Sequence, residues 1–176
     1  MGSVAKGYAG QLAAQMLREH SVQSALLNLG GNVQTVGAKP DGSPWQIGIK
    51  DPQGEDAMMV LSVEDQAVVT SGGYERYFEQ DGQTYWHIMD PSTGHPADSG
   101  LISVTIVGDE GVVCDGLSTA LFVMGLEKAA DLWAQSGDFE AVFVTASGEV
   151  YITEGLQDRF ALTEQYADTP VSVIER

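Results

Sequence analysis

The sequence predicts an α+β fold in which a mixed, largely antiparallel sheet is covered by about three helices. Three observations lead to this expectation. Apolar residues recur at helical spacing in three stretches of the chain. Short runs of alternating or continuous apolar residues, typical of strands, lie between those stretches. Turn signals such as Asp81-Gly82 follow several of these runs, and such turns join antiparallel neighbours in a hairpin.

The three helices are expected over residues 6–20, within 114–125 and over 126–135. Gly137 is expected to end the third, because glycine readily adopts the left-handed conformation that closes a helix. The apolar residues of the first helix fall on one face, which we expect to be its inner face. They are Ala9, Leu12, Ala13, Met16 and Leu17.

The strands are expected where short apolar runs are bounded by turn residues. They cover residues 24–29, 45–49, 58–63, 67–70, 84–89, 102–107, 141–145, 150–153 and 159–163. A chain of 176 residues can bury one substantial core, so residues 1–164 are expected to form one domain. Residues 165–176 carry no clear signal and are expected to be a frayed C-terminal tail.

Composition excludes several classes of partner. The formal net charge is −17, and the eight Lys and Arg residues are scattered, so binding to nucleic acid or to an anionic membrane is not expected. An anionic dinucleotide would need a divalent cation or backbone amides to hold it. Cys114 is the only cysteine, which rules out an internal disulfide, and we expect a small buried residue there and not a nucleophile. No signal peptide or membrane span is expected.

The segment 85–96 joins a strand, a sharp break and two of the three histidines. Pro91 has no amide to donate and therefore ends the strand pairing. Asp90 and Thr93 can bond to their own turn backbone, and Gly94 supplies conformational freedom. We expect a rigid polar loop directly after the imidazole of His87. An ordinary turn beside a structural histidine is the alternative.

A second polar run, Ser71-Gly72-Gly73-Tyr74-Glu75-Arg76, follows an apolar strand. Glycines allow the backbone to approach a ligand closely, and Arg76 can pair with a carboxylate or phosphate. The alternative is a bulge or hairpin with a surface salt bridge. The hairpin expected at Asp81-Gly82 would bring the end of this run close to the turn at Asp90-Pro91.

A third motif begins at Cys114 and places Asp115 and Thr119 four residues apart. Residues at this spacing lie on one face of a helix, one turn apart. A carboxylate and a hydroxyl so placed can both reach one hard cation, which prefers oxygen ligands. In the alternative interpretation, Asp115 is a helix cap or first-turn acid favoured by the helix dipole.

These motifs resemble, in content and order, those of the ApbE family, the FAD:protein FMN transferases. The resemblance extends over residues 5–162, although family members are about twice as long and the half that precedes Ala5 is missing. The segments that carry it are Ala5-Lys6-Gly7-Tyr8-Ala9, Asn28-Leu29-Gly30-Gly31-Asn32, the run from Ser71 to Phe78, the run from His87 to Pro96, and the run from Asp115 to Gly125.

The resemblance implies one lobe of the ApbE-type fold and a magnesium-dependent transfer of FMN from FAD to a Thr or Ser of a target flavoprotein, with release of AMP. Asp115 and Thr119 would bind Mg²⁺, and His87 would be the catalytic base. The family acts in the cell envelope, membrane-anchored or periplasmic. The residues expected to contact FAD are Lys6, Asn32, Ser71, Gly72, Tyr74, Arg76, His87, Asp90, Thr93 and Gly94.

Three other interpretations stay open at this point. The chain can be a module that binds FAD without transferring FMN. It can be a magnesium-dependent pyrophosphatase that hydrolyses FAD to FMN and AMP. It can also be a lobe whose apolar seam requires the missing N-terminal half, or a second copy in a homodimer, before it binds any ligand.

Overall fold

The structure is a computed structural model that describes residues 2–75, 77–80 and 83–176. The α+β class is confirmed: three α-helices accompany a largely antiparallel set of strands in the described part of the chain. The helices are α1 (Ala5–Glu19), α2 (Gly111–Met124) and α3 (Leu126–Ser136). Gly137 ends α3 with a φ of 73°, as the sequence predicts.

A seven-stranded sheet with the order β1-β2-β5-β10-β11-β12-β14 forms the centre of the molecule. Neighbouring strands in this sheet are antiparallel, except that β12 and β14 are parallel to each other. Its strands are β1 (Ala25–Asn28), β2 (Asn32–Val36), β5 (Ala67–Gly72), β10 (Leu101–Gly108), β11 (Glu140–Thr145), β12 (Val150–Thr153) and β14 (Val171–Ile174).

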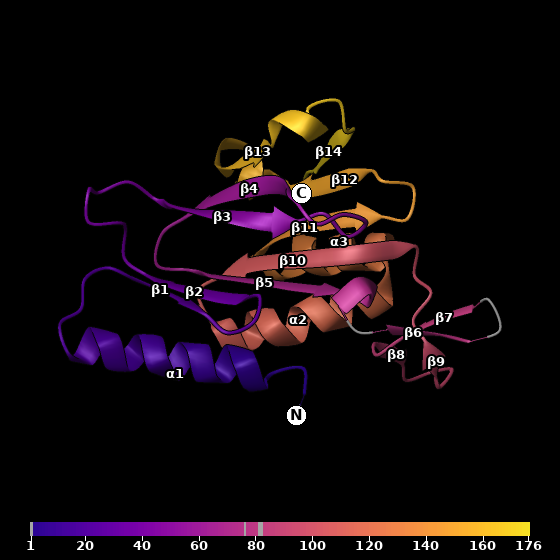
Figure 1. The fold of residues 1–176 in the computed structure, drawn as a ribbon, viewed down its shortest axis with the longest axis horizontal. Helices are drawn as coiled ribbons and strands as arrows, with labels where there is room; N and C mark the ends of the chain where they lie inside the picture. Colours follow the sequence, from indigo (N-terminus) through magenta and orange to yellow (C-terminus); the bar gives the residue numbers. More distant parts are fainter. Residues whose placement is uncertain (1, 76, 81–82) are drawn as a thin grey trace.

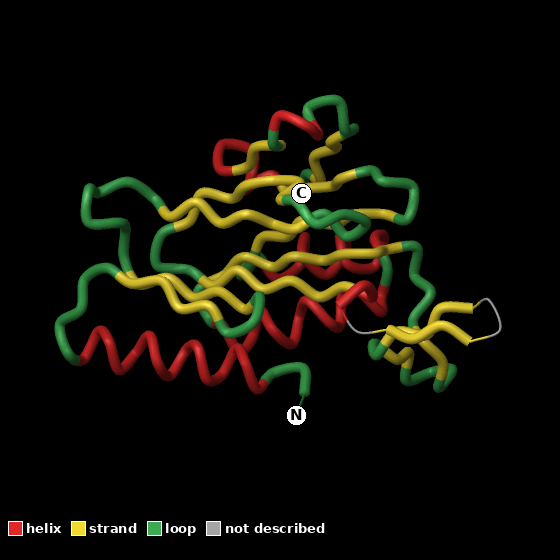
Figure 2. The backbone as a smooth tube through the Cα atoms, viewed as in Figure 1, coloured by secondary structure: helices red, strands yellow, loops and turns green. Residues whose placement is uncertain are grey.

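Three smaller sheets complete the fold. The first has the order β13-β4-β3, formed by β13 (Phe160–Leu162), β4 (Ala57–Val63) and β3 (Trp45–Lys50). The others are the pairs β6 (Tyr77–Gln80) with β7 (Gln83–Trp86) and β8 (Met89–Asp90) with β9 (His95–Pro96). Figure 2 shows these two pairs as a short arm that stands apart from the central sheet.

The central sheet is covered on both faces. Helices α2 and α3 pack on one face, where Val69 and Ile106 belong to the first core cluster. Strands β3 and β4 pack on the other face, where Val68 and Val107 belong to the second cluster (Figure 1). Because neighbouring residues enter opposite cores, β5 and β10 are mostly apolar. Thr70 and Ser71, at the end of β5, are polar exceptions to this apolar pattern.

Helix α1 begins within one residue of the prediction, but the predicted inner face is wrong. The residues that pack inward are Gly7, Gly10 and Ala14. Leu12 and Met16 are instead 41% and 59% exposed. Small residues decide the orientation because α1 crosses very close to α2. A Cβ atom at Gly7 would collide with the carbonyl oxygen of Gly111.

Two further expectations are corrected. The strand expected over residues 84–89 is divided into β7 and β8, and His87 and Ile88 lie between them. The C-terminal residues do not fray: β14 pairs with β12, and the guanidinium of Arg176 lies 4.5 Å from the ring centre of Trp133. Strand β2 has no counterpart in the prediction, because its mixed sequence Asn-Val-Gln-Thr-Val follows a glycine turn.

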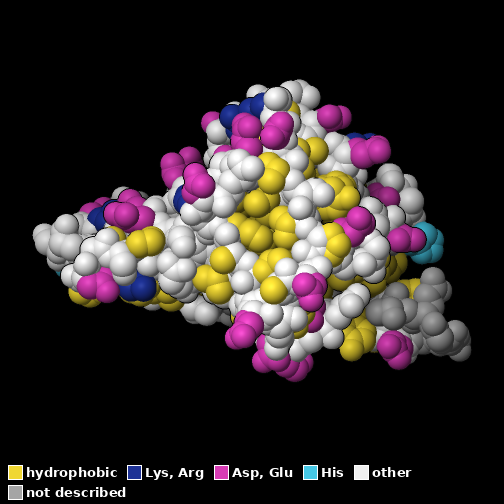
Figure 3. Space-filling model, turned by 90° about the horizontal axis from the view of Figure 1, so that it is seen from above, with side chains coloured by type: hydrophobic (Ala, Val, Ile, Leu, Met, Phe, Trp, Pro, Cys, Tyr) yellow, Lys and Arg dark blue, Asp and Glu magenta, His cyan; other side chains and the backbone are white. Residues whose placement is uncertain are grey.

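Acidic residues outnumber basic ones, 25 to 8. Figure 3, seen from above, shows Asp and Glu around the whole visible face and few Lys or Arg. In the part of the chain that the structure describes, no helix is long and apolar enough to cross a membrane.

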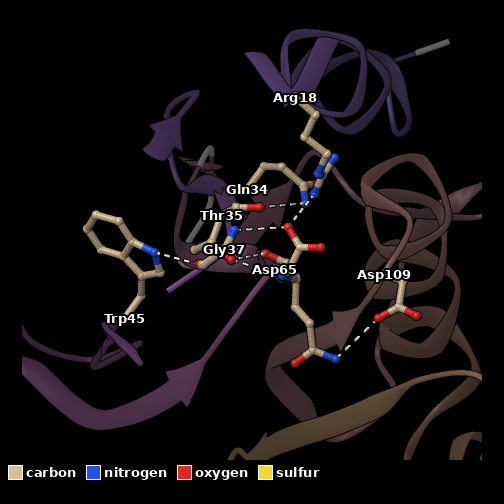
Figure 4. Close-up of polar contacts among 8 residues, drawn as sticks. Arg18, Gln34, Thr35, Gly37, Trp45, Asp65 and Asp109 are labelled. Atoms are coloured by element: carbon tan, nitrogen blue, oxygen red, sulfur yellow. Dashed lines mark hydrogen bonds and ion pairs between the residues drawn. The ribbon is translucent and has the colours of Figure 1, made fainter. Parts of the chain in front are cut away.

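One polar network ties the end of α1 to the turn between β4 and β5 (Figure 4). The guanidinium of Arg18 donates to Oδ1 of Asp65 at 2.6 Å, and the backbone N–H of Gly37 donates to the same oxygen at 3.0 Å. The indole of Trp45 donates to the carbonyl of Gly37 at 2.9 Å. Partial burial opposes ionisation of Asp65, but the bonds from Arg18 and Gly37 outweigh it and lower the pKa of this carboxyl below 3.8.

We expect Asp65→Asn to lower the free energy of unfolding at pH 7 by about 0.5 kcal/mol, since exposed ion pairs are weak. Asn tolerates the positive φ of 55° at this position. Because its pKa is lowered in the folded state, ionised Asp65 stabilises the fold when the pH is above the ordinary carboxyl pKa of 3.8. The difference in free energy of unfolding between the variant and the unsubstituted chain should therefore vanish as the pH falls through and below 3.8. Urea unfolding at pH 7 and pH 3 measures it. Glu64→Gln in the same turn is the control, and a difference that persists at pH 3 would contradict the assignment.

Candidate functional site

A cavity of about 510 Å³ lies where the end of β5, one side of α2, the start of α1 and the segment after β7 meet. Six of the residues predicted for the site line it, although they come from four segments far apart in the sequence. They are Lys6, Ser71, Gly72, His87, Asp115 and Thr119. The fold thus brings together the motifs that the sequence analysis identified separately.

Asp115 occupies the second turn of α2, which begins at Gly111. The interpretation as a helix cap or first-turn acid is therefore wrong. The side chain is only 5% exposed, and its Oδ2 accepts the backbone N–H of Gly7 at 2.8 Å. The close crossing of α1 and α2 at Gly7 and Gly111 makes this bond possible. Helix α1 thereby fixes the orientation of the carboxylate.

Three hydroxyl groups lie next to Asp115. The Ser71 hydroxyl is 2.8 Å from that of Ser118 and 3.2 Å from that of Thr119. Ser118 also donates to the backbone carbonyl of Asp115 at 3.0 Å. The sequence analysis missed Ser118 and Gly7. Ser118 follows Asp115 by three residues, so helical spacing would have found it, whereas the role of Gly7 depends on a contact between two helices.

This part of the cavity fits a hard divalent cation. Its donors are carboxylate and hydroxyl oxygens, and Asp115 is buried without an ion pair to any described Lys or Arg. No group of three His, Cys, Asp or Glu that could hold a metal exists within the described residues. Asp115 and Thr119 alone would therefore not complete the coordination of such a cation, and a bound phosphate would have to supply further oxygens.

His87 lines the cavity and is exposed. Both of its neighbours are anchored. The indole of Trp86 donates to the carbonyl of Ala97 at 3.0 Å, and Ile88 is buried while its carbonyl accepts the N–H of Ala97 at 2.9 Å. The backbone on both sides of His87 is consequently held by contacts with Ala97.

Lys6 supplies the positive charge in the described lining of the cavity. Its ammonium donates to the carbonyl of Gly30 at 3.1 Å, which ties the start of α1 to the glycine turn before β2. A cation on the rim of an otherwise acidic protein is suited to an anionic ligand.

Four residues predicted to contact FAD lie away from this cavity. Asn32 is 2% exposed beneath α1, and no described group bonds to its amide nitrogen. Asp90, Thr93 and Gly94 build the turn between β8 and β9. In that turn, Oδ1 of Asp90 accepts the N–H and the hydroxyl of Ser92, which lowers the pKa of Asp90. These contacts are local and structural.

Two predicted residues remain. Tyr74 lines a different cavity of about 450 Å³, together with Tyr77 and Trp86, and its ring packs against Gly72. Arg76 lies outside the described residues.

Cys114 is buried as expected, and burial, reinforced by nearby acids such as Asp109, raises the pKa of its thiol to about 12. Its thiolate is therefore not available as a nucleophile at neutral pH.

We expect Gly7→Ala to destabilise the protein by about 2 kcal/mol, because an added methyl group forces α1 away from α2. The displaced helix would also withdraw the N–H that Asp115 accepts. Gly10→Ala is the matched control. Its Cβ atom would meet no atom closer than 3.7 Å, and alanine favours the helix. Urea unfolding measures both, and equal stabilities of the two variants would contradict the close crossing.

The fold and the cavity define an α+β domain with a buried carboxylate, several hydroxyls and one cation around a single polar cavity. A family model described as the ApbE family matches residues 1–143, and the chain belongs to this family. The chain is 40% identical to the FAD:protein FMN transferase of Klebsiella pneumoniae over 163 residues, which is 92% of this chain and 50% of that protein. It is 39% identical to that of Treponema pallidum over 169 residues, 90% of this chain and 47% of that protein.

Solved structures agree. The ApbE protein of Thermotoga maritima superposes with a TM-score of 0.83 at 39% identity, covering 90% of this chain and 52% of that one. The apo flavinyl transferase ApbE of Pseudomonas stutzeri gives a TM-score of 0.74 at 37% identity, covering 90% and 50%. The chain therefore spans about half the length of the relatives it matches.

Proposed function

We propose that this chain is the lobe of an FAD:protein FMN transferase that holds the pyrophosphate of FAD and transfers FMN to a Thr or Ser of a target flavoprotein. The observation that carries the proposal is the single cavity that gathers Lys6, Ser71, His87, Asp115 and Thr119. The names of the relatives support the same reaction.

Asp115 and Thr119 are the residues that would hold Mg²⁺. When bound there, the ion would neutralise charge on the pyrophosphate, which is the main requirement of phosphoryl transfer. Gly7 holds the carboxylate of Asp115, and the hydroxyls of Ser71 and Ser118 hold the side of α2 that carries Thr119.

The remaining residues of the cavity would bind the substrate. The ammonium of Lys6 would pair with a phosphate oxygen. Gly72 has no side chain, so its backbone could approach the ligand closely; packing also requires glycine there, since a Cβ atom would collide with the ring of Tyr74. FAD carries two negatively charged phosphates, and the ammonium of Lys6 together with one Mg²⁺ would supply the positive charge that balances them.

His87 would act as the general base. Its imidazole would accept the proton of the acceptor hydroxyl while that oxygen forms a bond to the phosphorus of the FMN moiety. The bond from this phosphorus to the bridging oxygen then breaks, and AMP leaves with the electron pair. The exposed position of His87 suits a hydroxyl that is part of another protein.

One observation favours a second candidate, an FAD-binding lobe without transfer activity: the chain spans only half of each relative. The exposed His87 also admits water, which would give hydrolysis of FAD to FMN and AMP. The target flavoprotein and a location in the cell envelope are proposed from the family resemblance alone.

A titration of FAD into the 176-residue chain, followed by flavin fluorescence with and without MgCl₂, tests the proposal. Binding that depends on magnesium, followed by AMP release and FMN addition to an acceptor peptide, supports transfer. Binding without AMP release favours the binding module, and AMP release without FMN addition favours hydrolysis. An absence of binding in both conditions would contradict a site preformed by this chain.

A further inference from the structure

Helix α1 carries large apolar side chains on the face that points away from the sheet. Tyr8, Leu12 and Met16 follow one another at intervals of four residues and are 55%, 41% and 59% exposed. Ala5 and Ala9 lie in the same arc and are also exposed. We call the surface formed by these residues the outer face of α1. It contains no charged side chain, and residues 7–17 carry none at all, in a chain whose net charge is −17.

The opposite side of the same helix is already buried. Gly7, Gly10 and Ala14 pack there against α2 and β2. A surface helix normally presents polar residues to solvent, and a helix that is apolar on both sides is normally enclosed. The sequence and the packing therefore indicate a second partner for α1.

The position of the outer face says what kind of partner this is. Helix α1 runs beside β1, the terminal strand of the central sheet (Figure 1). Ser3 and Lys6 at the start of α1 line the cavity. A protein segment that covers the outer face would thus lie at the β1 edge of the central sheet and next to the cavity.

We propose that the outer face of α1 is the docking surface for the half of the family fold that this chain does not match. About half of each relative lies outside the matched part, while the matched part superposes on one of them with a TM-score of 0.83. A second half like that of the relatives would need a contact surface on this lobe, and the outer face is uncharged, apolar and adjacent to the site. The inference concerns assembly and does not depend on the proposed reaction.

Apolar side chains are also exposed elsewhere in the described part of the chain, among them Leu26 on β1 and Val113 and Met124 on α2. Val171 and Val173, on the terminal strand β14, are 37% exposed each, and Figure 3 shows hydrophobic side chains gathered in the middle of the face seen from that side. Tyr77 and Phe78 are exposed on the arm, where Phe78 stacks on Tyr85 with ring centres 5.1 Å apart. Among these described surfaces, the outer face of α1 combines exposed apolar side chains on successive helical turns with a buried opposite side and a position next to the cavity.

The experiment compares the 176-residue chain with a chimera in which this chain replaces the matched part of the Klebsiella pneumoniae relative. Leu12→Glu and Met16→Glu are introduced into both, and Val173→Glu is the matched control. Because Leu12 and Met16 are exposed, and glutamate is a good helix former, the melting temperature of the 176-residue chain should stay unchanged. In the chimera the same changes should lower it by about 5 °C or more, since they bury a charge in an apolar contact.

Val173→Glu should have the same small effect in both proteins. The proposal is overturned if Leu12→Glu and Met16→Glu affect both proteins equally, or if only Val173→Glu lowers the melting temperature of the chimera. A chimera that is insoluble where both parent proteins are soluble also counts against it, because the two halves then do not fit through this face. None of these readouts requires flavin or transfer activity.

Discussion

Substitution of Asp115 by asparagine is expected to abolish magnesium-dependent FAD binding. Asp115 is the only acidic residue in the described lining of the cavity, so its charge is the main protein contribution to a metal site there. Asparagine keeps the shape of the side chain and an oxygen that can accept the N–H of Gly7. We expect the affinity for FAD in the presence of MgCl₂ to fall by about 100-fold or more, because loss even of an outer-shell partner typically costs a metal site about 10- to 100-fold.

The same substitution should leave the protein at least as stable when magnesium is absent. The carboxylate is 5% exposed and forms no ion pair with a described basic residue, so its burial is costly and the neutral amide removes that cost. A melting temperature that is unchanged or raised, combined with lost binding, would assign a ligand role to Asp115. Lost binding with a lowered melting temperature would indicate a structural role instead.

Thr119→Ser and Thr119→Val provide the matched pair for this experiment. Serine retains the hydroxyl that lies 3.2 Å from that of Ser71, whereas valine keeps the volume and removes the oxygen. Magnesium-dependent binding should survive in Thr119→Ser and weaken in Thr119→Val. If the Asp115→Asn variant binds FAD with the same magnesium dependence as the unsubstituted chain, the assignment of the metal site to Asp115 and Thr119 is wrong.

The central part of the site could be predicted because its chemistry is encoded at short range. Asp115 and Thr119 are four residues apart, so they share a helix face wherever the helix begins. Ser71 and Gly72 end a strand that begins with a clear apolar run. The cavity also depends on two antiparallel pairings, β5 with β10 and β6 with β7, and the hairpin signal in the sequence suggests the second of them. Local pattern and global fold agree at these positions.

The parts that were missed depend on contacts between distant segments. The inner face of α1 could not be found from apolar spacing, because Leu12 and Met16 give a stronger periodic signal than Gly7 and Gly10. Glycine is selected there by the closeness of α2, a property of the packed pair of helices. The burial of Asn32 next to α1 likewise depends on the packing of distant segments and could not be found from its own sequence neighbourhood.

Substitution of His87 by alanine is expected to reduce FMN transfer by about 10²- to 10⁴-fold, the usual contribution of a positioned general base. FAD binding should change little, because the proposed Mg²⁺ ligands Asp115 and Thr119 lie on α2, away from the segment that carries His87. Stability should also be maintained. The neighbours Trp86 and Ile88 hold the backbone through their own contacts with Ala97, and those contacts do not involve the His87 side chain.

His95→Ala is the matched control for His87→Ala. His95 is an exposed histidine on β9, in the same arm, and it does not line the cavity. Mass spectrometry of an acceptor peptide measures FMN addition, AMP release is followed in parallel, and both are measured in the 176-residue chain and in the chimera. Transfer that is lost in His87→Ala, retained in His95→Ala, and accompanied by unchanged FAD affinity would assign the base. Equal activity of the two variants would show that another group accepts the proton of the acceptor hydroxyl, and the arm would then serve only to line the cavity.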